Sequence, residues 1–202
     1  MGRCYSSISD DNIDPPAQPC ADAARADGLP CYCTTYTTSG ALGMGLRVTV
    51  AEGDVDGFLG VTVKGRSYGR FIGLPYATAR RFCKPKTPPG WKGVRKANLK
   101  VVCAQNEFLT GRGMRGVEDG LVANVYSPVE ALGVPAKLPV MVFIHGGAFT
   151  QGDGNPDVIG PGWLLDYGVI LVTINYRLGP LGFLTTGNDA IPANLVTLIL
   201  LS

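Results

Sequence analysis

The most regular feature of the chain is a pair of short apolar runs without polar alternation. Val140–Ile144 and Val169–Ile174 consist mainly of β-branched and other apolar residues. Such runs are typical of strands that are covered on both faces inside a parallel sheet. The first run leads directly into a glycine pair, Gly146 and Gly147. We therefore predict two buried central strands, the first ending where backbone can approach a ligand closely.

Alternation of apolar and polar residues predicts a β-hairpin nearer the N-terminus. Leu46–Val50 alternates, Glu52–Asp54 supplies a turn, and Val55–Val63 returns as a second strand. Two further elements are expected. They are a short strand over Leu121–Tyr126, closed by a Ser-Pro pair, and one short helix over Gly160–Asp166.

Residues 1–44 show no sustained periodicity and are rich in proline, aspartate, threonine and glycine. We expect an irregular or unrelated extension there. The segment lacks the basic and then apolar order of a signal peptide. Met1–Ser6 matches the myristoylation pattern, with Cys4 as a second lipid site, but so short a pattern is more often a chance match. The sequence therefore leaves the localisation unassigned.

Composition narrows the classes of function. The 202 residues, of which 46% are hydrophobic, suit one turn-rich α/β domain. The net charge of +2 comes without the basic cluster that nucleic acid requires, and no apolar run approaches the ~20 residues of a membrane-spanning helix. Cys31-Tyr-Cys33 has neither metal-ligand nor redox spacing. We predict no nucleic-acid partner, no transmembrane segment, no metal and no cofactor.

One serine fits the letters of a hydrolase motif. Ser67 lies between Gly65 and Gly69 in a G-x-S-x-G spacing, which in a nucleophile elbow stands between a strand and a helix. Gly73 and Pro75 follow, and they do not allow a helix. We therefore expect a loop between strands at Ser67 and no catalytic role.

The stretch after the first apolar run is the stronger candidate for chemistry. His145, Gly146, Gly147 and Ala148 place small residues where the strand Val140–Ile144 ends. In α/β-hydrolases, an HGGG-type loop after the third strand donates N–H groups to the oxyanion hole. A glycine turn after a core strand explains the same residues equally well, so this stretch alone leaves both interpretations open.

Six blocks in a fixed order extend the match over about residues 46–194. They are Phe71–Ala77, Arg81-Phe82, Trp91–Val94, Glu118–Tyr126, Met141–Phe149 and Gly168–Phe183. Together they resemble the type-B carboxylesterase and cholinesterase-like family of α/β-hydrolases, and the last block is most similar to an insect esterase.

The resemblance implies the N-terminal part of an α/β-hydrolase fold, with an N-terminal β-hairpin and the first strands of a central mixed sheet. Residues 45–194 would form a partial carboxylesterase domain, and residues 195–202 a tail outside the family. The family's nucleophile, acid and base lie beyond residue 194, and its substrates are small-molecule carboxylic esters. We therefore expect an inactive piece of a serine esterase, from a truncated gene product or a mis-spliced transcript. The alternative is a non-catalytic cholinesterase-like module for adhesion or binding.

The resemblance also implies roles for single residues. The N–H groups of Gly147 and Ala148 match oxyanion donors, and His145 matches a histidine of this loop and not the catalytic base. Arg81 and Glu118 match a buried, structural ion pair that connects two loops bidentately.

Two departures from the family concern Cys103 and the C-terminal end of the matching residues. Gly120 stands where the family has a cysteine bonded to the position of Cys103, which leaves Cys103 and Cys83 free and removes roughly 3 kcal/mol of stabilisation. Arg177 matches an arginine whose acidic partner lies in a helix that Leu195–Ser202 replaces.

The same strand order predicts an exposed edge. In the family, the strand matching Val140–Ile144 lies beside the strand that carries the nucleophile. Without that neighbour, a long, flat and apolar edge is left uncovered, and Leu195–Leu201 adds a second exposed apolar segment. We therefore expect the chain to be prone to aggregation.

Overall fold

The computed structural model describes residues 36–39, 45–107, 111, 113–134, 137–157, 159–188 and 190–196. These residues belong to one unit that spans residues 32–202. The sequence predicts irregular structure over residues 1–44, but Tyr36–Ser39 form strand β1 and pair with β2. The other residues of that extension, with the lipidation pattern and four of the cysteines, lie outside the described residues.

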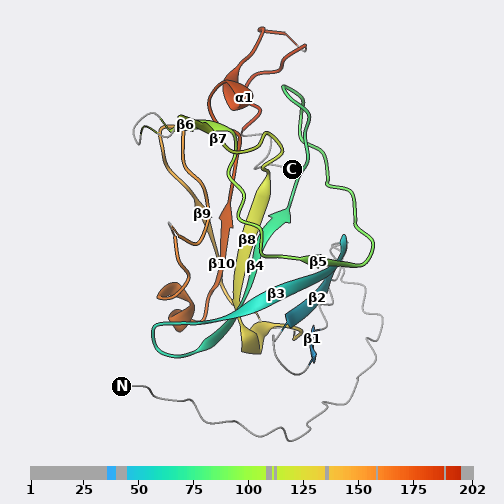
Figure 1. Ribbon diagram of the computed structural model, residues 1–202, viewed down its shortest axis with the longest axis vertical. Coiled ribbons are helices and arrows are strands. Elements are labelled where there is room, and N and C mark those ends of the chain that lie inside the picture. The colour runs from blue at the N-terminus through green and yellow to red at the C-terminus, as the bar shows by residue number, and fades with distance from the viewer. Residues whose placement is uncertain are drawn as a thin grey trace, which may run out of the picture. The chain divides into compact units, whose positions relative to one another are not determined.

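A mixed eight-stranded sheet forms the body of this unit (Figure 1). The strands follow the order β1-β2-β3-β4-β8-β10-β9, and β5 pairs with β3. Neighbours are antiparallel except for two parallel pairs, β10 with β9 and β3 with β5. The strands are β1 (Tyr36–Ser39), β2 (Gly45–Val50), β3 (Gly53–Val61), β4 (Ser67–Pro75), β5 (Val94–Lys96), β8 (Val122–Pro128), β9 (Val140–Ile144) and β10 (Ile170–Ile174).

The remaining elements of the described residues are short. They are a two-stranded sheet of β6 (Gln105–Glu107) and β7 (Gly113–Arg115), the 3-10 turns η1 (Val129–Ala131) and η2 (Leu164–Tyr167), and α1 (Gly179–Phe183). The helix predicted over Gly160–Asp166 is thus only the turn η2. It ends after one turn because Gly168 adopts a left-handed conformation with a φ of 71°.

The predicted hairpin is confirmed as β2 and β3, which pair from Gly45 with Phe58 to Val50 with Gly53. Alternation along these strands places their apolar side chains against β4. The resulting cluster contains Leu46, Val48, Val55, Phe71 and Ala97. A second cluster fills the space between β4, β8, β10 and η2, and it contains Tyr68, Tyr126, Leu165 and Leu171.

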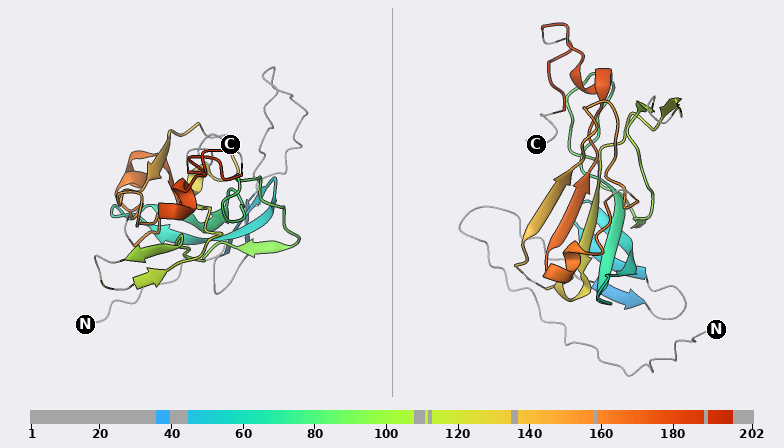
Figure 2. Two further views of the ribbon diagram at one scale, coloured as in Figure 1. Left: turned by 90° about the horizontal axis from the view of Figure 1, so that it is seen from above. Right: turned by 90° about the vertical axis from the view of Figure 1, so that its left-hand side faces the viewer.

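Strand β9 lies at the border of the sheet, beside β10 (Figure 2, right). Its register pairs Val140 with Ile170 and Ile144 with Ile174. The sequence predicts that β9 is buried on both faces, but Val142 is 59% exposed and Ile144 is 50% exposed. The prediction is wrong for β9 in this structure, because no described strand pairs with its outer edge and only Phe143 of its five side chains is partly buried, against the cluster of Tyr126 and Leu171.

The start of the apolar segment Leu195–Leu201 is buried and not exposed as the sequence predicts. Leu195 is 0% exposed, and Val196 is 5% exposed and packs with Cys103, Tyr176 and Leu178. Residues 197–201 lie outside the described part of the chain. No helix among the described residues is long and apolar enough to cross a membrane.

Ser67 is the first residue of β4 and does not lie in a loop, contrary to the prediction. Its pairing with Val61 of β3 continues the hairpin ladder beyond the expected turn. The chain then stays extended as far as Pro75, so no helix follows the serine. The residue therefore lacks the strand-to-helix turn of a nucleophile elbow.

Candidate functional site

The loop after β9 has an unusual backbone. Gly147, Ala148 and Phe149 follow one another with positive φ angles of 122°, 52° and 58°. For a residue with a Cβ, this conformation costs roughly 1–2 kcal/mol. Two such residues in succession persist only where other contacts hold the loop, and strain of this kind concentrates at functional sites.

The turn that follows holds the carbonyl group of Gly147. Its oxygen accepts hydrogen bonds from the N–H groups of Thr150 and Gln151, at 3.0 and 3.2 Å, and from the Thr150 hydroxyl at 3.2 Å. In a trans peptide, the carbonyl oxygen and the N–H of the next residue point in opposite directions. Since the Gly147 oxygen faces into the turn, the N–H of Ala148 points out of it.

His145 orients the preceding peptide in the same way. Its Nδ1 lies 2.9 Å from the Gly146 oxygen, and because a carbonyl oxygen only accepts, Nδ1 carries the proton. The N–H of Gly147 belongs to this peptide and therefore points away from the imidazole ring. The loop thus presents two consecutive N–H groups whose directions are set by neighbouring hydrogen bonds.

These two N–H groups are available to an external acceptor. Neither Gly147 nor Ala148 donates a backbone hydrogen bond to any described residue. Both residues are exposed. Adjacent free N–H groups in such a curved backbone form a concave site that favours negatively charged oxygen.

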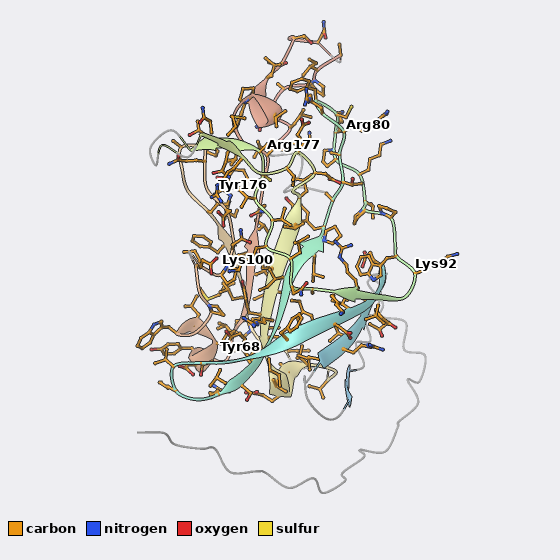
Figure 3. The ribbon with its side chains drawn as sticks, in the orientation of Figure 1. Tyr68, Arg80, Lys92, Lys100, Tyr176 and Arg177 are labelled. Atoms are coloured by element: carbon orange, nitrogen blue, oxygen red, sulfur yellow. The ribbon has the colours of Figure 1, made fainter. Side chains whose placement is uncertain are left out.

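The imidazole of His145 is packed deep in the fold. His145 is 5% exposed, and its ring stacks on that of Tyr176 with a centroid separation of 4.3 Å (Figure 3). The Tyr176 hydroxyl donates a hydrogen bond to the backbone oxygen of His145 at 2.7 Å. Burial lowers the pKa of His145, while the hydrogen bond to Gly146 and the Asp153 carboxylate act in the opposite direction. A neutral ring that is already committed through Nδ1 suits a structural role and not that of a catalytic base.

Buried side-chain amides hold the segment that follows the turn. Gln105 bonds to Gly152, and Asn175 accepts from the Gly154 N–H at 2.9 Å. Asn124 and Thr173 donate to the Gly154 oxygen at 2.7 and 2.5 Å. Sequence reasoning missed these residues because their partners are distant along the chain. The one local signal is that Asn175 directly follows an apolar strand.

Arg81 and Glu118 form the bidentate pair that the sequence predicts, but the pair is not buried. Arg81 Nε donates to Glu118 Oε2 at 2.9 Å, and Arg81 Nη2 donates to Oε1. The side chains are 62% and 38% exposed, because both residues lie on surface loops. Their mutual hydrogen bonds raise the pKa of Arg81 and lower that of Glu118.

Arg177 is the buried cation of this region. It is 4% exposed, and its guanidinium donates to the Cys83 and Arg80 carbonyl oxygens at 2.8 Å each (Figure 3). Burial is the largest influence on its pKa, which is lowered, while nearby Glu118 and Asp119 act in the opposite direction. In the described residues the acidic partner implied by the resemblance is thus replaced by backbone carbonyls.

The arm of residues 103–107 and 113–120 begins at a free, buried thiol. Cys103 Sγ lies 3.4 Å from the Gly120 oxygen, and burial raises the pKa of Cys103 to about 12. Cys83 is also free but exposed. The two thiols therefore differ in reactivity, since only thiolates react readily.

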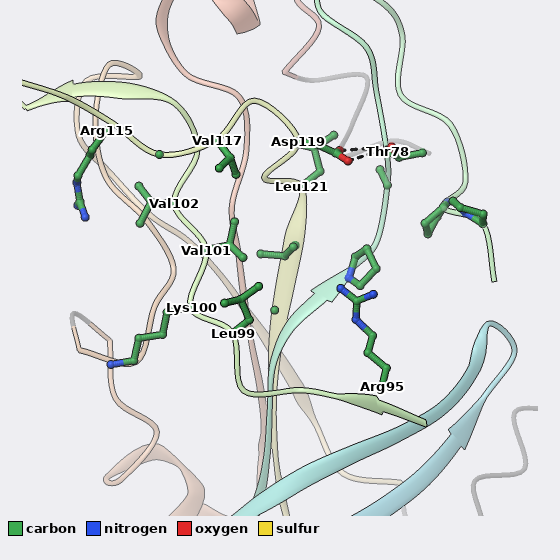
Figure 4. A pocket seen from close by; sticks show the side chains of 17 residues that line it. Thr78, Arg95, Leu99, Lys100, Val101, Val102, Arg115, Val117, Asp119 and Leu121 are labelled. Atoms are coloured by element: carbon green, nitrogen blue, oxygen red, sulfur yellow. Dashed lines mark hydrogen bonds between the residues drawn. The ribbon is translucent and has the colours of Figure 1, made fainter. Parts of the chain in front are cut away.

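The cavities near these elements include two large ones. The larger, of about 720 Å³, borders the ends of β4 and β8 and the segment Leu99–Val102 (Figure 4). At its rim the Thr78 hydroxyl bonds to Asp119 at 3.3 Å, and none of its lining residues belongs to the loop after β9. The smaller, of about 630 Å³, is bordered by Thr150 and Gln105. Only this second cavity touches the loop. Among the described residues no cluster of side chains could hold a metal ion.

Comparisons with known proteins give the family of the chain. Residues 45–198 match the model of the carboxylesterase family. The chain is 42% identical to mouse bile salt-activated lipase over 64% of its own length and 23% of that protein. It is 39% identical to juvenile hormone esterase of Tribolium castaneum, over 81% of the chain and 28% of that protein. It is 38% identical to a carboxylic ester hydrolase of Bombus ignitus, over 74% of the chain and 28% of that protein.

A solved structure shows the same fold. The crystal structure of juvenile hormone esterase from Manduca sexta superimposes with a TM-score of 0.68 and 34% identity, covering 76% of this chain and 30% of that one. The chain thus spans about a quarter of the length of its curated relatives. The predicted fold class, the N-terminal part of an α/β-hydrolase, is confirmed, as is the similarity to insect esterases. The chain belongs to the carboxylesterase family.

Proposed function

We propose that the loop after β9 is the oxyanion-binding element of a carboxylic ester hydrolase, with the N–H groups of Gly147 and Ala148 as donors. One observation carries this proposal: both N–H groups are free of partners among the described residues, and hydrogen bonds to Gly146 and Gly147 turn them outward. The methyl group of Ala148 leaves its N–H in place. The substrate class is a small-molecule carboxylic ester.

These donors act on a charge that appears only during the reaction. Attack on an ester carbonyl creates a tetrahedral oxyanion, and removing one oxyanion donor typically costs about 10²–10³ in kcat. Strained, held backbone suits this task because fixed N–H groups need no reorganisation when the charge develops. The loop thus supplies electrostatic stabilisation, while the nucleophile and its base must come from other residues.

The described residues offer neither a histidine nor an elbow-like serine that suits catalysis. The chain's one histidine is His145, which is buried and committed to Gly146, and Ser67 lies inside an extended strand. We expect the purified chain to leave a short p-nitrophenyl ester unhydrolysed above the buffer rate. Steady turnover that a serine-directed organophosphate abolishes would show that a catalytic serine is present after all.

The donor roles can be tested by removing single N–H groups. A chimera would carry residues 45–196 of this chain in place of the matching segment of the Bombus ignitus carboxylic ester hydrolase. Lactic acid at position 148 converts the Ala148 amide to an ester and deletes its N–H. We expect kcat to fall about 10²–10³-fold with little change in KM.

Position 149 provides the matched control. Phenyllactic acid there deletes the N–H of Phe149, which is not one of the assigned donors. It should leave kcat within about threefold, since no donor to the oxyanion is lost. An unchanged kcat after substitution at 148, or an equal loss at 149, would refute the assignment.

A further inference from the structure

The carboxamide of Gln105 makes three hydrogen bonds, two of them to the segment that follows the loop after β9. The residue is 3% exposed and lies on β6, within the arm of residues 103–107 and 113–120. Its Nε2 donates to the Gly152 oxygen at 2.9 Å and to the Cys103 oxygen at 3.1 Å. Its Oε1 accepts from the Gly152 N–H at 2.8 Å. One side chain thus holds both backbone groups of Gly152.

Gly152 lies directly against the Gly146 carbonyl, which belongs to the same peptide as the Gly147 N–H. It has a φ of 120°, and a Cβ at this position would lie 2.5 Å from both the Gly146 oxygen and His145 Nδ1. These are the two atoms whose hydrogen bond directs the Gly147 N–H outward. A displacement of Gly152 therefore reaches the Gly146 peptide without any intervening residue.

A second contact joins the arm to the same segment. Arg115 on β7 lies 3.4 Å from a carboxylate oxygen of Asp153, which is 8% exposed at its side chain. The other oxygen of Asp153 accepts from the Asn155 N–H at 2.9 Å. Strand β6 thus contacts Gly152 and strand β7 contacts the residue directly after it, while the eight-stranded sheet holds Gly154 through Asn124.

We propose that Gln105 is a positioning residue for the oxyanion loop, which fixes the direction of the Gly147 N–H through Gly152 and the Gly146 carbonyl. The catalytic effect of this positioning rests on the proposed function. The positioning itself does not, because the direction of an N–H bond can be measured without any reaction. The arm, which carries no covalent tether at Cys103, thereby becomes part of the catalytic geometry.

The direct test is made on the full chain by NMR. Residual dipolar couplings report the direction of each N–H bond. We expect Gln105→Ala to change the couplings of Gly147 and Ala148 and to leave those of β8 and β10 unchanged. The matched control is Asn124→Ala, which also deletes a buried amide but contacts Gly154 and Gly73, and it should leave the Gly147 coupling unchanged.

The catalytic test uses the chimera described above. Gln105→Ala should lower kcat about 10–100-fold with KM within about threefold, because a displaced donor weakens transition-state binding only. Gln105→Glu keeps the acceptor for the Gly152 N–H, so it should recover part of kcat and covers the case in which the alanine variant does not fold. Trp91→Phe, which deletes a half-buried hydrogen bond to the Asp54 oxygen on β3 and touches no residue of the loop, should leave kcat within about threefold.

The outcomes separate the two proposals. Unchanged Gly147 couplings and kcat in folded Gln105 variants overturn the positioning role, even if lactic acid at 148 still lowers kcat. Equal effects of the Asn124 and Gln105 variants on the Gly147 coupling, or of the Trp91 and Gln105 variants on kcat, overturn it as well, since general loosening would then be the cause. Changed couplings with a kcat insensitive to lactic acid at 148 support the positioning role and reject the proposed function.

Discussion

At the scale of single residues, Gly147 and Gly146 are neighbours with opposite requirements. A Cβ on Gly147 would lie 1.9 Å from the Gln151 oxygen, at a φ of 122° that side chains rarely adopt. A Cβ on Gly146 would meet nothing within 4 Å. We expect Gly147→Ala to lower the free energy of unfolding by about 2–3 kcal/mol and Gly146→Ala by less than about 0.5 kcal/mol.

Urea denaturation of the full chain, followed by circular dichroism, compares these two variants under identical conditions. Equal losses would mean that the loop does not hold the backbone described here. The motif identified the glycine pair from sequence, but only the φ angles distinguish which glycine is indispensable.

His145 makes stability depend on pH. Burial lowers its pKa in the folded chain, so the unfolded chain, with a pKa near about 6.5, binds the proton first as the pH falls. The contribution of His145 to stability is therefore full above the unfolded pKa and is lost progressively as the pH falls through it towards the folded pKa.

His145→Asn tests this sign. Asparagine places an N–H donor near the position of Nδ1 and does not titrate, and the chain has one histidine. We expect the free energy of unfolding, from urea titrations at about pH 7.5 and about pH 5.5, to fall more in the native chain than in the variant. An equal fall in both would exclude His145 as the source.

Some residue roles cannot be predicted from sequence. Gln105 and Gly152 are 47 positions apart, and nothing in the local pattern of either residue indicates the other. Hydrophobic periodicity reports burial along one element, whereas a side-chain amide that holds a distant loop depends on tertiary placement. The loop itself was predictable because its small residues directly follow an apolar strand.

At the scale of elements, the arm between Cys103 and Gly120 has a free thiol facing a glycine. A Cβ on Gly120 would lie 2.9 Å from Cys103 Sγ and 3.2 Å from Cys103 Cα, so a disulfide fits after a small backbone shift. We expect Gly120→Cys to form this disulfide and to raise the free energy of unfolding by roughly 3 kcal/mol.

Comparison of oxidised and reduced Gly120→Cys by thermal denaturation isolates this gain. The double variant Gly120→Cys with Cys103→Ser keeps the new residue but cannot form the bond, and it serves as the control. A gain that survives reduction, or that appears in the double variant, would contradict the disulfide explanation.

Element prediction succeeded where the pattern was long. The hairpin of β2 and β3 follows from alternation over many residues, β9 and β10 follow from apolar runs, and β8 follows from a short strand pattern closed by a Ser-Pro pair. Strands β5, β6 and β7 have three residues each, too few for a period to emerge. The apolar pattern of β9 alone mispredicted its burial, because a pattern records what a strand can pack against and not which strand lies beside it, whereas the strand order implied by the resemblance predicted the exposed edge.

At the scale of the whole unit, the outer edge of β9 is an exposed apolar edge of the sheet. Four of its apolar side chains are between 45% and 59% exposed, and its backbone has no partner on that side among the described strands. Such edges pair with other chains. We expect Val142→Lys to reduce light scattering of the purified chain severalfold, because a charge on an edge strand opposes pairing.

Val63→Lys is the control for this substitution. Val63 is 56% exposed, but it lies in the turn between β3 and β4 and not on an edge strand. The charge added is the same, so an equal reduction would mean that net charge, and not the edge of β9, governs association.

The strand order also has a consequence for synthesis on the ribosome. Strand β9 is made before β10 but lies outside it, and its pairing in the described sheet is with β10 alone. Strands β1, β2, β3, β4 and β8 can therefore pair in the order in which they are made. Strand β9 can join the sheet only after β10 has been made and has paired with β8. At roughly 5–20 residues per second, the roughly 30 residues between the ends of these strands take about 1.5–6 s to translate. During that interval β9, a wholly apolar strand, is without its partner, so the pace of translation over residues 145–174 sets how long it stays unpaired.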